Sequence, residues 1–267
     1  MELGLRGRGC IVTGASGGIG AASARALAAE GASLLLAGRR TEALARVAAA
    51  CTEAGAPAAA THACDLTDAD AADALVLAAA ERLGRIDVLV NCAGTTGTRS
   101  VDELSDADWQ LQWDLHVMAP MRLMRAAGER MAQGGWGRVV NVVSSSAKRP
   151  SGSLDMSYSV TKAAQLSLSR AFADRLAPRG VLVNAVVPGP IDGQMWRAPG
   201  GLAEQLARSS DRTPEQVLQQ LAARQPSGRL GTEEEVAAVI VFLCSERAAN
   251  VVGAAWSVDG GAVPTIF

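Results

Sequence analysis

A tyrosine and a lysine stand four residues apart in the segment Ser157–Ala164, where together they could move a proton. In a helix, this spacing places Tyr158 and Lys162 on one face. A free phenol has a pKa of about 10, too high for a base near neutral pH, and a neighbouring cation lowers that pKa. The pair suits proton transfer to or from an alcohol or carbonyl oxygen. A tyrosine packed over a lysine stem has the same spacing, so the surrounding elements must decide between the two.

Short apolar runs alternate along the chain with longer Ala/Leu-rich segments. This alternation predicts a single-domain α/β fold, a Rossmann-like doubly wound parallel sheet of about seven strands with helices on both faces. Helices are expected near residues 18–30, 41–54, 68–83, 102–131, 155–177 and 232–245. The expected strands are Gly9–Thr13, Ser33–Ala37, Ala58–His62, Val88–Asn91, Arg138–Val143, Val181–Val186 and Ala254–Val258.

One stretch, from about residue 190 to 228, departs from this regular alternation. It is rich in Gly, Pro, Gln and Arg and carries two short helical patches, near 201–208 and 214–223. An insertion of this length that follows a strand is typical of a substrate lid. No internal repeat or linker interrupts the rest, so we expect residues 1–267 to form one Rossmann-like domain with this lid.

A glycine-rich loop joins the first expected strand to the first expected helix, in the form Gly14-x-x-x-Gly18-x-Gly20. Glycines there let the backbone turn tightly and approach a pyrophosphate at the helix N-terminus. The second strand ends in Gly38, Arg39 and Arg40, where an NAD-specific fold places a carboxylate for the ribose. Guanidinium groups there would bind a 2′-phosphate, which favours NADP(H) over NAD(H). A plain tight turn and surface arginines are the alternative interpretations.

Composition excludes several other classes of function. The net charge of −2 gives no electrostatic basis for binding nucleic acid or an anionic membrane. The N-terminus has no signal-like apolar stretch and no run could span a bilayer, so a soluble cytoplasmic protein is expected. Two histidines and five scattered cysteines make a metal site improbable.

Together these motifs resemble the short-chain dehydrogenase/reductase (SDR) family over nearly the whole chain. The matching segments, in family order, are Thr13–Gly20, Asp65, Asn91–Gly94, a serine after the fifth strand, Tyr158 with Lys162, and Pro188–Pro190. The resemblance implies a carbonyl reductase or alcohol dehydrogenase in which Tyr158 is the general acid/base and Lys162 also bonds the nicotinamide ribose. The cofactor residues that it implies, beside those two, are Gly14, Ser16, Gly18, Ile19, Gly20, Asp65, Leu66, Asn91, Ala93, Gly94, Pro188, Gly189 and Ile191.

The chain departs from the family pattern at three positions. His116 stands where the family has a catalytic asparagine, and it either carries protons itself, leaves the water relay to its backbone, or is a core residue. Three serines follow Val143, and strand register favours Ser144 as the catalytic serine, whereas the usual distance to the tyrosine favours Ser145. Gly193 replaces a threonine that often bonds the nicotinamide carboxamide.

Substrate contacts are expected from Thr95, Thr96, Leu154, Met156, Met195, Trp196 and the insertion that follows Trp196. These predict an apolar or amphipathic carbonyl compound as the small-molecule substrate. Family resemblance also implies a homotetramer, or next a homodimer. A dinucleotide-binding sensor without catalysis is the main alternative. Such a sensor would not need to retain Tyr158 and Lys162, so their presence argues against it. An epimerase or dehydratase acting on a nucleotide-linked substrate is a third possibility, but those relatives are usually longer than this chain and carry a larger C-terminal substrate domain.

Overall fold

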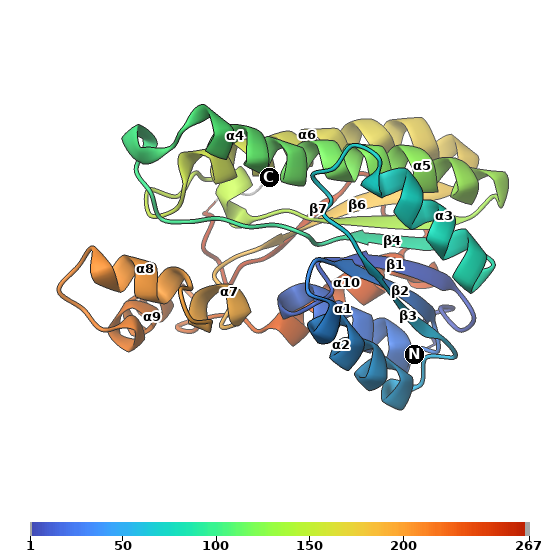
Figure 1. Ribbon diagram of the computed structural model, residues 1–267, viewed down its shortest axis with the longest axis horizontal. Coiled ribbons are helices and arrows are strands. Elements are labelled where there is room, and N and C mark those ends of the chain that lie inside the picture. The colour runs from blue at the N-terminus through green and yellow to red at the C-terminus, as the bar shows by residue number, and fades with distance from the viewer. Residues whose placement is uncertain (1, 265–267) are drawn as a thin grey trace.

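Seven parallel strands form one sheet through the middle of the molecule (Figure 1), and the computed structural model describes residues 2–264. The strand order is β3-β2-β1-β4-β5-β6-β7. This is the doubly wound sheet expected from the alternation of apolar runs and helices. Its strands are β1 (Gly9–Thr13), β2 (Ser33–Gly38), β3 (Ala59–Ala63), β4 (Val88–Asn91), β5 (Gly137–Val142), β6 (Val181–Pro188) and β7 (Ala255–Val258).

Helices cover both faces of the sheet (Figure 1). One face carries α1 (Gly18–Ala29), α2 (Thr41–Ala54) and α10 (Glu233–Cys244), and the other carries α3 (Ala71–Leu83), α4 (Asp106–Trp113), α5 (Ala119–Gln133) and α6 (Met156–Leu176). Successive strand residues point to opposite faces: Val12 joins the core under α1 and α10, and Ile11 joins the core under α3 and α5. Both cores need apolar residues, which is why the strands are apolar throughout.

The strand order reverses at β1, which pairs with β2 on one side and β4 on the other. The chain therefore leaves the carboxyl ends of these two central strands in opposite directions. A crevice opens at such a reversal and is the usual ligand site of an open α/β sheet. The glycine loop follows β1 at this point, and the segment Cys92–Gly94 follows β4.

The helix expected over 102–131 is divided. A three-residue 3₁₀ turn (Val101–Glu103) precedes α4, and a π-helical turn (Asp114–Met118) joins α4 to α5. A π-turn is a single inserted turn, too short for the apolar pattern of a helix this long to reveal it. The helix expected from residue 68 begins at Ala71, and β3 lies one residue later than expected.

Residues 190–228 fold beside the main body, around three short helices (Figure 1). These are α7 (Gln194–Arg197), α8 (Leu202–Arg208) and α9 (Pro214–Ala223), and the last two confirm the helical patches expected there. A small core of Trp196, Leu202, Ala203, Leu218 and Leu230 holds them together. We refer to residues 190–228 as the lid, a role that stays a prediction.

Within residues 2–264, no helix has the length and apolar character needed to cross a bilayer. The same residues contain no cluster of three or more His, Cys, Asp or Glu side chains arranged to hold a metal ion.

A buried carboxylate fixes the start of α6 against the loop that follows β4. Asp155 is fully buried, and its oxygens accept hydrogen bonds from the Gly97 N–H (3.1 Å), the Arg99 N–H (2.9 Å), the Arg99 guanidinium (3.0 Å) and the Gln112 amide (3.1 Å). Its backbone carbonyl accepts from the Tyr158 N–H at 3.1 Å. Asp155 thus joins α4, α6 and the loop 95–99 immediately before the reactive tyrosine.

Replacement of Asp155 tests this junction. We expect Asp155→Ala to lower the free energy of unfolding by about 2–4 kcal/mol, because it leaves buried donors without an acceptor. Asp155→Asn retains one acceptor oxygen, so we expect it to lower the free energy of unfolding by less than Asp155→Ala. Urea unfolding measures both, with the exposed Asp102→Ala as the matched control. A loss from Asp155→Ala no larger than the control's would contradict the junction.

Candidate active site

The loop after β1 forms a cradle in which side chains would not fit. Gly14 has a φ of +64°, and a Cβ there would lie 2.8 Å from the Ala93 Cα. A Cβ on Gly20 would lie 2.4 Å from the Gly14 carbonyl oxygen. The loop leads into the N-terminus of α1, whose free N–H groups and dipole favour an anion. The cradle therefore fits the pyrophosphate of a dinucleotide.

One end of the site is cationic. Arg40 donates hydrogen bonds to the Ser16 hydroxyl (3.1 Å) and to the Ser16 carbonyl oxygen (3.1 Å). Arg39 is exposed, and its guanidinium lies 3.9 Å from an Asp65 carboxylate oxygen. Asp65 in turn accepts from the Thr67 N–H and hydroxyl, which hold its carboxyl pKa below the usual range. Ser16 and the two arginines form a donor set that suits a phosphate at the end of β2.

The cradle and the reactive tyrosine face one cleft of about 550 Å³. Of the residues predicted to bind the cofactor, Asn91 is the one that does not line this cleft. It is buried, and its amide donates to the Asn141 amide oxygen at 2.8 Å, which joins β4 to β5. The predicted residues that do line the cleft are Gly14, Ser16, Gly18, Ile19, Gly20, Arg39, Arg40, Asp65, Leu66, Ala93, Gly94, Tyr158, Lys162, Pro188, Gly189 and Ile191.

Tyr158, Lys162 and Ser144 meet on the wall of the cleft, and all three are more than nine-tenths buried. The Lys162 Nζ lies 5.8 Å from the centre of the Tyr158 ring. Helix α6 presents the two side chains on one face, as their spacing predicted. Ser144 follows the end of β5 by two residues, and its hydroxyl acts on the Tyr158 phenol to lower the phenol pKa.

The pKa of the phenol moves in the direction opposite to the expected one. Burial raises the Tyr158 pKa above its usual value, and the Ser144 hydrogen bond opposes this only in part. Burial also lowers the Lys162 pKa to about 8. A desolvated site disfavours both the phenolate and the ammonium, and the sequence argument weighed only the attraction between them.

The structure separates the competing serines. Ser144 lines the cleft, and its hydroxyl oxygen also accepts from the Ser146 N–H at 3.1 Å. Ser145 begins a 3₁₀ turn and is not among the lining residues. This placement favours the register argument for Ser144, and the identity of the catalytic serine stays a prediction.

His116 lies in the π-turn, fully buried, with both ring nitrogens engaged. Its Nε2 accepts from the Thr95 N–H (3.1 Å), so the proton is on Nδ1, which lies 2.9 Å from the Thr161 hydroxyl oxygen. Burial and the charge of Lys162 hold the imidazole pKa well below its usual value. The ring edge faces Tyr158 at 5.5 Å between centres. This geometry supports the core interpretation over proton transfer by the imidazole, while the catalytic assignment stays a prediction.

The end of the cleft beyond Tyr158 is mostly apolar. Of the expected substrate contacts, Thr95, Thr96, Met195 and Trp196 line it. Leu154 packs instead against the lid core, and Met156 is exposed outside the lining. The insertion after Trp196, which was also expected to contribute, lines the cleft with residues 198–202 and Gln205. Leu111 and Leu115 line this end as well and were not predicted.

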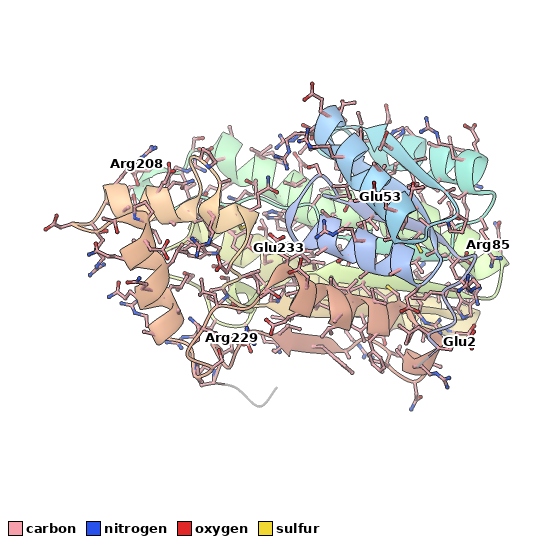
Figure 2. All side chains as sticks on the ribbon, turned by 90° about the horizontal axis from the view of Figure 1, so that it is seen from below. Glu2, Glu53, Arg85, Arg208, Arg229 and Glu233 are labelled. Atoms are coloured by element: carbon pink, nitrogen blue, oxygen red, sulfur yellow. The ribbon has the colours of Figure 1, made fainter. Side chains whose placement is uncertain are left out.

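Sequence spacing contained a signal for two of those residues. Leu111 and Leu115 are four residues apart, which places them on one helix face turned toward the site. Two polar lining residues were also missed, Gln194 at the start of the lid and Glu233 at the start of α10. The Gln194 N–H donates to a Glu233 carboxylate oxygen at 2.9 Å, and Figure 2 shows Glu233 at the start of α10.

Comparison with known proteins agrees with this geometry. Residues 14–263 match a family model described as enoyl-(acyl carrier protein) reductase. The chain belongs to the short-chain dehydrogenase/reductase family. This SDR protein is 37% identical over 251 residues to the short-chain reductase protein NovJ of Streptomyces niveus, covering 94% of this chain and 92% of the relative.

Two further relatives differ in the substrates that their names state. A cis-4-hydroxycyclohexanecarboxylate dehydrogenase of Sinomonas cyclohexanicum is 38% identical, covering 95% of this chain and 96% of the relative. The solved L-sorbose reductase of Gluconobacter frateurii, complexed with NADPH and L-sorbose, is 34% identical with a TM-score of 0.93 and covers 100% of both chains. Family membership supports nicotinamide-dependent oxidoreduction as the activity of this chain.

The state of His116 has a consequence for stability. Because its folded pKa is lowered, the folded chain binds fewer protons than the unfolded chain as the pH falls through about 6.5. We expect the free energy of unfolding to fall by about 1.4 kcal/mol per pH unit below that value from this group alone. Urea unfolding at a series of pH values should show a shallower slope in His116→Asn. His62→Asn is the control, and equal slopes in wild type and His116→Asn would contradict the neutral, buried state.

Proposed function

We propose that the protein is an NADP(H)-dependent carbonyl reductase or alcohol dehydrogenase, with Tyr158 as the general acid/base. The observation that carries this proposal is the meeting of Tyr158, Lys162 and Ser144 on the wall of the cleft that also contains the glycine cradle. A dinucleotide bound in the cradle would extend along the cleft toward the tyrosine. A non-catalytic sensor would have no use for three buried polar groups there.

The nicotinamide supplies or accepts the hydride at the carbonyl carbon when the cofactor is bound. The protein holds the carbonyl oxygen by hydrogen bonds from the Ser144 and Tyr158 hydroxyls, which strengthen as negative charge develops on it. In reduction, the Tyr158 phenol gives its proton to that oxygen and becomes a phenolate. The Lys162 ammonium stabilises the phenolate. In oxidation, the phenolate takes the proton of the alcohol.

The raised pKa of Tyr158 suits the reductive direction. A buried phenol that keeps its proton at neutral pH is ready to donate it, whereas oxidation first requires the phenolate. We therefore expect reduction to dominate near neutral pH and oxidation to gain as the pH rises.

Apolar lining supports a ketone with an apolar or amphipathic body as the substrate. Leu111, Leu115, Met195, Trp196 and Leu202 surround the cleft beyond the tyrosine, and Thr95, Thr96 and Gln205 are the polar exceptions among its lining there. A polyol would leave most of its hydroxyls without partners against these side chains. The cyclic alcohol named for the Sinomonas relative carries fewer hydroxyls than L-sorbose and would leave fewer of them without partners. A homotetramer or homodimer stays a prediction from the family, and a cytoplasmic location stays a prediction from the sequence.

Catalysis by this trio is tested with three variants. We expect Tyr158→Phe to lower kcat by at least about a thousandfold and Ser144→Ala by about a hundredfold, because each removes a donor to the developing alkoxide. Ser145→Ala is the matched control and should keep most activity. NADPH oxidation with a panel of cyclic and acyclic ketones measures this. If Ser145→Ala alone is inactive, the serine assignment is wrong. Tight NADPH binding without turnover by the wild type would favour a sensor.

Cofactor preference is tested at the two arginines. Arg39 is exposed, so Arg39→Leu should weaken NADPH binding by about tenfold or more and leave NADH binding nearly unchanged. Arg40 also hydrogen-bonds Ser16 and contacts Gln194 at 3.4 Å, so Arg40→Leu should weaken the binding of both NADPH and NADH. Fluorescence titration with NADPH and NADH measures the four affinities. Equal losses of NADPH and NADH in Arg39→Leu would contradict the phosphate site.

A further inference from the structure

Gln165 lies three residues after Lys162 on α6 and is fully buried. Its amide oxygen accepts a hydrogen bond from the Lys162 Nζ at 2.8 Å. The Val142 carbonyl oxygen, at the end of β5, accepts a second at 2.9 Å. Within the described chain, the hydrogen-bond partners of this ammonium are therefore two neutral oxygens, from β5 and from its own helix.

The titratable groups around Lys162 are neutral near pH 7. Burial raises the pKa of the Cys92 thiol, beyond β4, to about 12, and it also raises the pKa of the Tyr158 phenol. The pKa of the His116 imidazole, in the π-turn, is lowered well below its usual value. Burial and Cys92 are the influences on the Lys162 pKa, and no carboxylate of the described residues acts on it. A buried ammonium without a counter-ion loses its proton readily.

Packing does not explain a glutamine at this position. The Gln165 Nε2 is buried and has no hydrogen-bond partner among the described residues. Such an orphan donor costs stability, so leucine or methionine would fill the same space more favourably. What an apolar side chain lacks is the oxygen that faces Lys162.

We propose that Gln165 is a positioning residue for Lys162: its amide oxygen fixes the lysine in place and keeps it an ammonium inside a dry site. The consequence for catalysis rests on the proposed function, because the ammonium matters there through the phenolate of Tyr158. The hydrogen bond itself does not depend on that function.

The composition of the chain allows a direct measurement. Lys148 and Lys162 are its only lysines. Protein labelled with ¹³C at the lysine ε-carbon therefore gives two NMR signals, and Lys148→Arg assigns them. Titration of the Lys162 signal reports its pKa without cofactor or substrate. Lys148, which bonds the Ser257 hydroxyl at the surface, serves as an internal reference.

We expect the Lys162 pKa, about 8 in the wild type, to fall by about one unit in Gln165→Met, because the methionine fills the space without accepting a hydrogen bond. Gln165→Glu keeps an acceptor and adds a negative charge, so it should raise the pKa above the wild-type value. Gln225→Met is the matched control, since Gln225 is another buried amide with one orphan atom, and should leave the Lys162 pKa unchanged.

Turnover provides a second measurement with any ketone that the wild type reduces. Gln165→Met should lower kcat by about fivefold at pH 8 and move the alkaline limb of its pH profile about one unit lower. A purely structural role would not move that limb. Lys162 pKa values in Gln165→Met and Gln165→Glu that match the wild type would overturn the proposal. If the Lys162 pKa shifts in the two Gln165 variants but the wild type reduces no ketone, the proposed function is overturned. The hydrogen bond from Lys162 to Gln165 would then still be established as the contact that sets the Lys162 pKa.

Discussion

The burial of one ammonium group sets the conditions for most of this site. Lys162 carries its charge into a region closed by α6, β5 and the π-turn, where water no longer stabilises it and its pKa falls to about 8. The same desolvation raises the pKa of Tyr158, so the phenol keeps its proton. Attraction between the phenolate and the ammonium opposes both pKa shifts, but the desolvation of each charged group outweighs it. Under the proposed function, every neutral oxygen that contacts the ammonium would therefore affect the reactivity of the tyrosine.

The loop after β4 depends on two buried side chains from opposite sides. Asp155, at the start of α6, binds the backbone of Gly97 and Arg99, and His116, in the π-turn, binds the Thr95 N–H. A π-turn widens the helix locally and allows the imidazole to reach both the loop and Thr161 on α6. The end of the cleft beyond Tyr158 is thus positioned by α6, which carries Tyr158 and Lys162, and by the π-turn that packs on it. A shift of either helix would move both walls together.

Sequence patterns predicted the sheet, the glycine cradle and the reactive pair because each depends on local spacing. Apolar runs mark buried parallel strands, and an interval of four residues places Tyr158 and Lys162 on one helix face wherever that helix packs. The π-turn, the contacts of Asp155 and the direction of the Tyr158 pKa shift depend on which distant segments close over the site. Strand register is also a local property, so the sequence could indicate Ser144. The structure places that serine on the wall of the cleft. Leu154 was misplaced because its position depends on the lid core, which forms between distant segments.

Several buried polar atoms have no hydrogen-bond partner among residues 2–264. Ser157 Oγ and Gln165 Nε2 lie on α6, Gln112 Oε1 lies on α4, which packs on α6, and Asn91 Oδ1 lies at the end of β4. Each costs about 1–3 kcal/mol relative to an apolar replacement. The two apolar cores on the faces of the sheet are extensive enough to tolerate this loss. Polar groups held at fixed positions in a dry site need no reorganisation when charge develops on a substrate oxygen, and this is the condition under which hydrogen bonds contribute most to catalysis. The local instability of the site and its preorganisation therefore arise from the same buried polar groups.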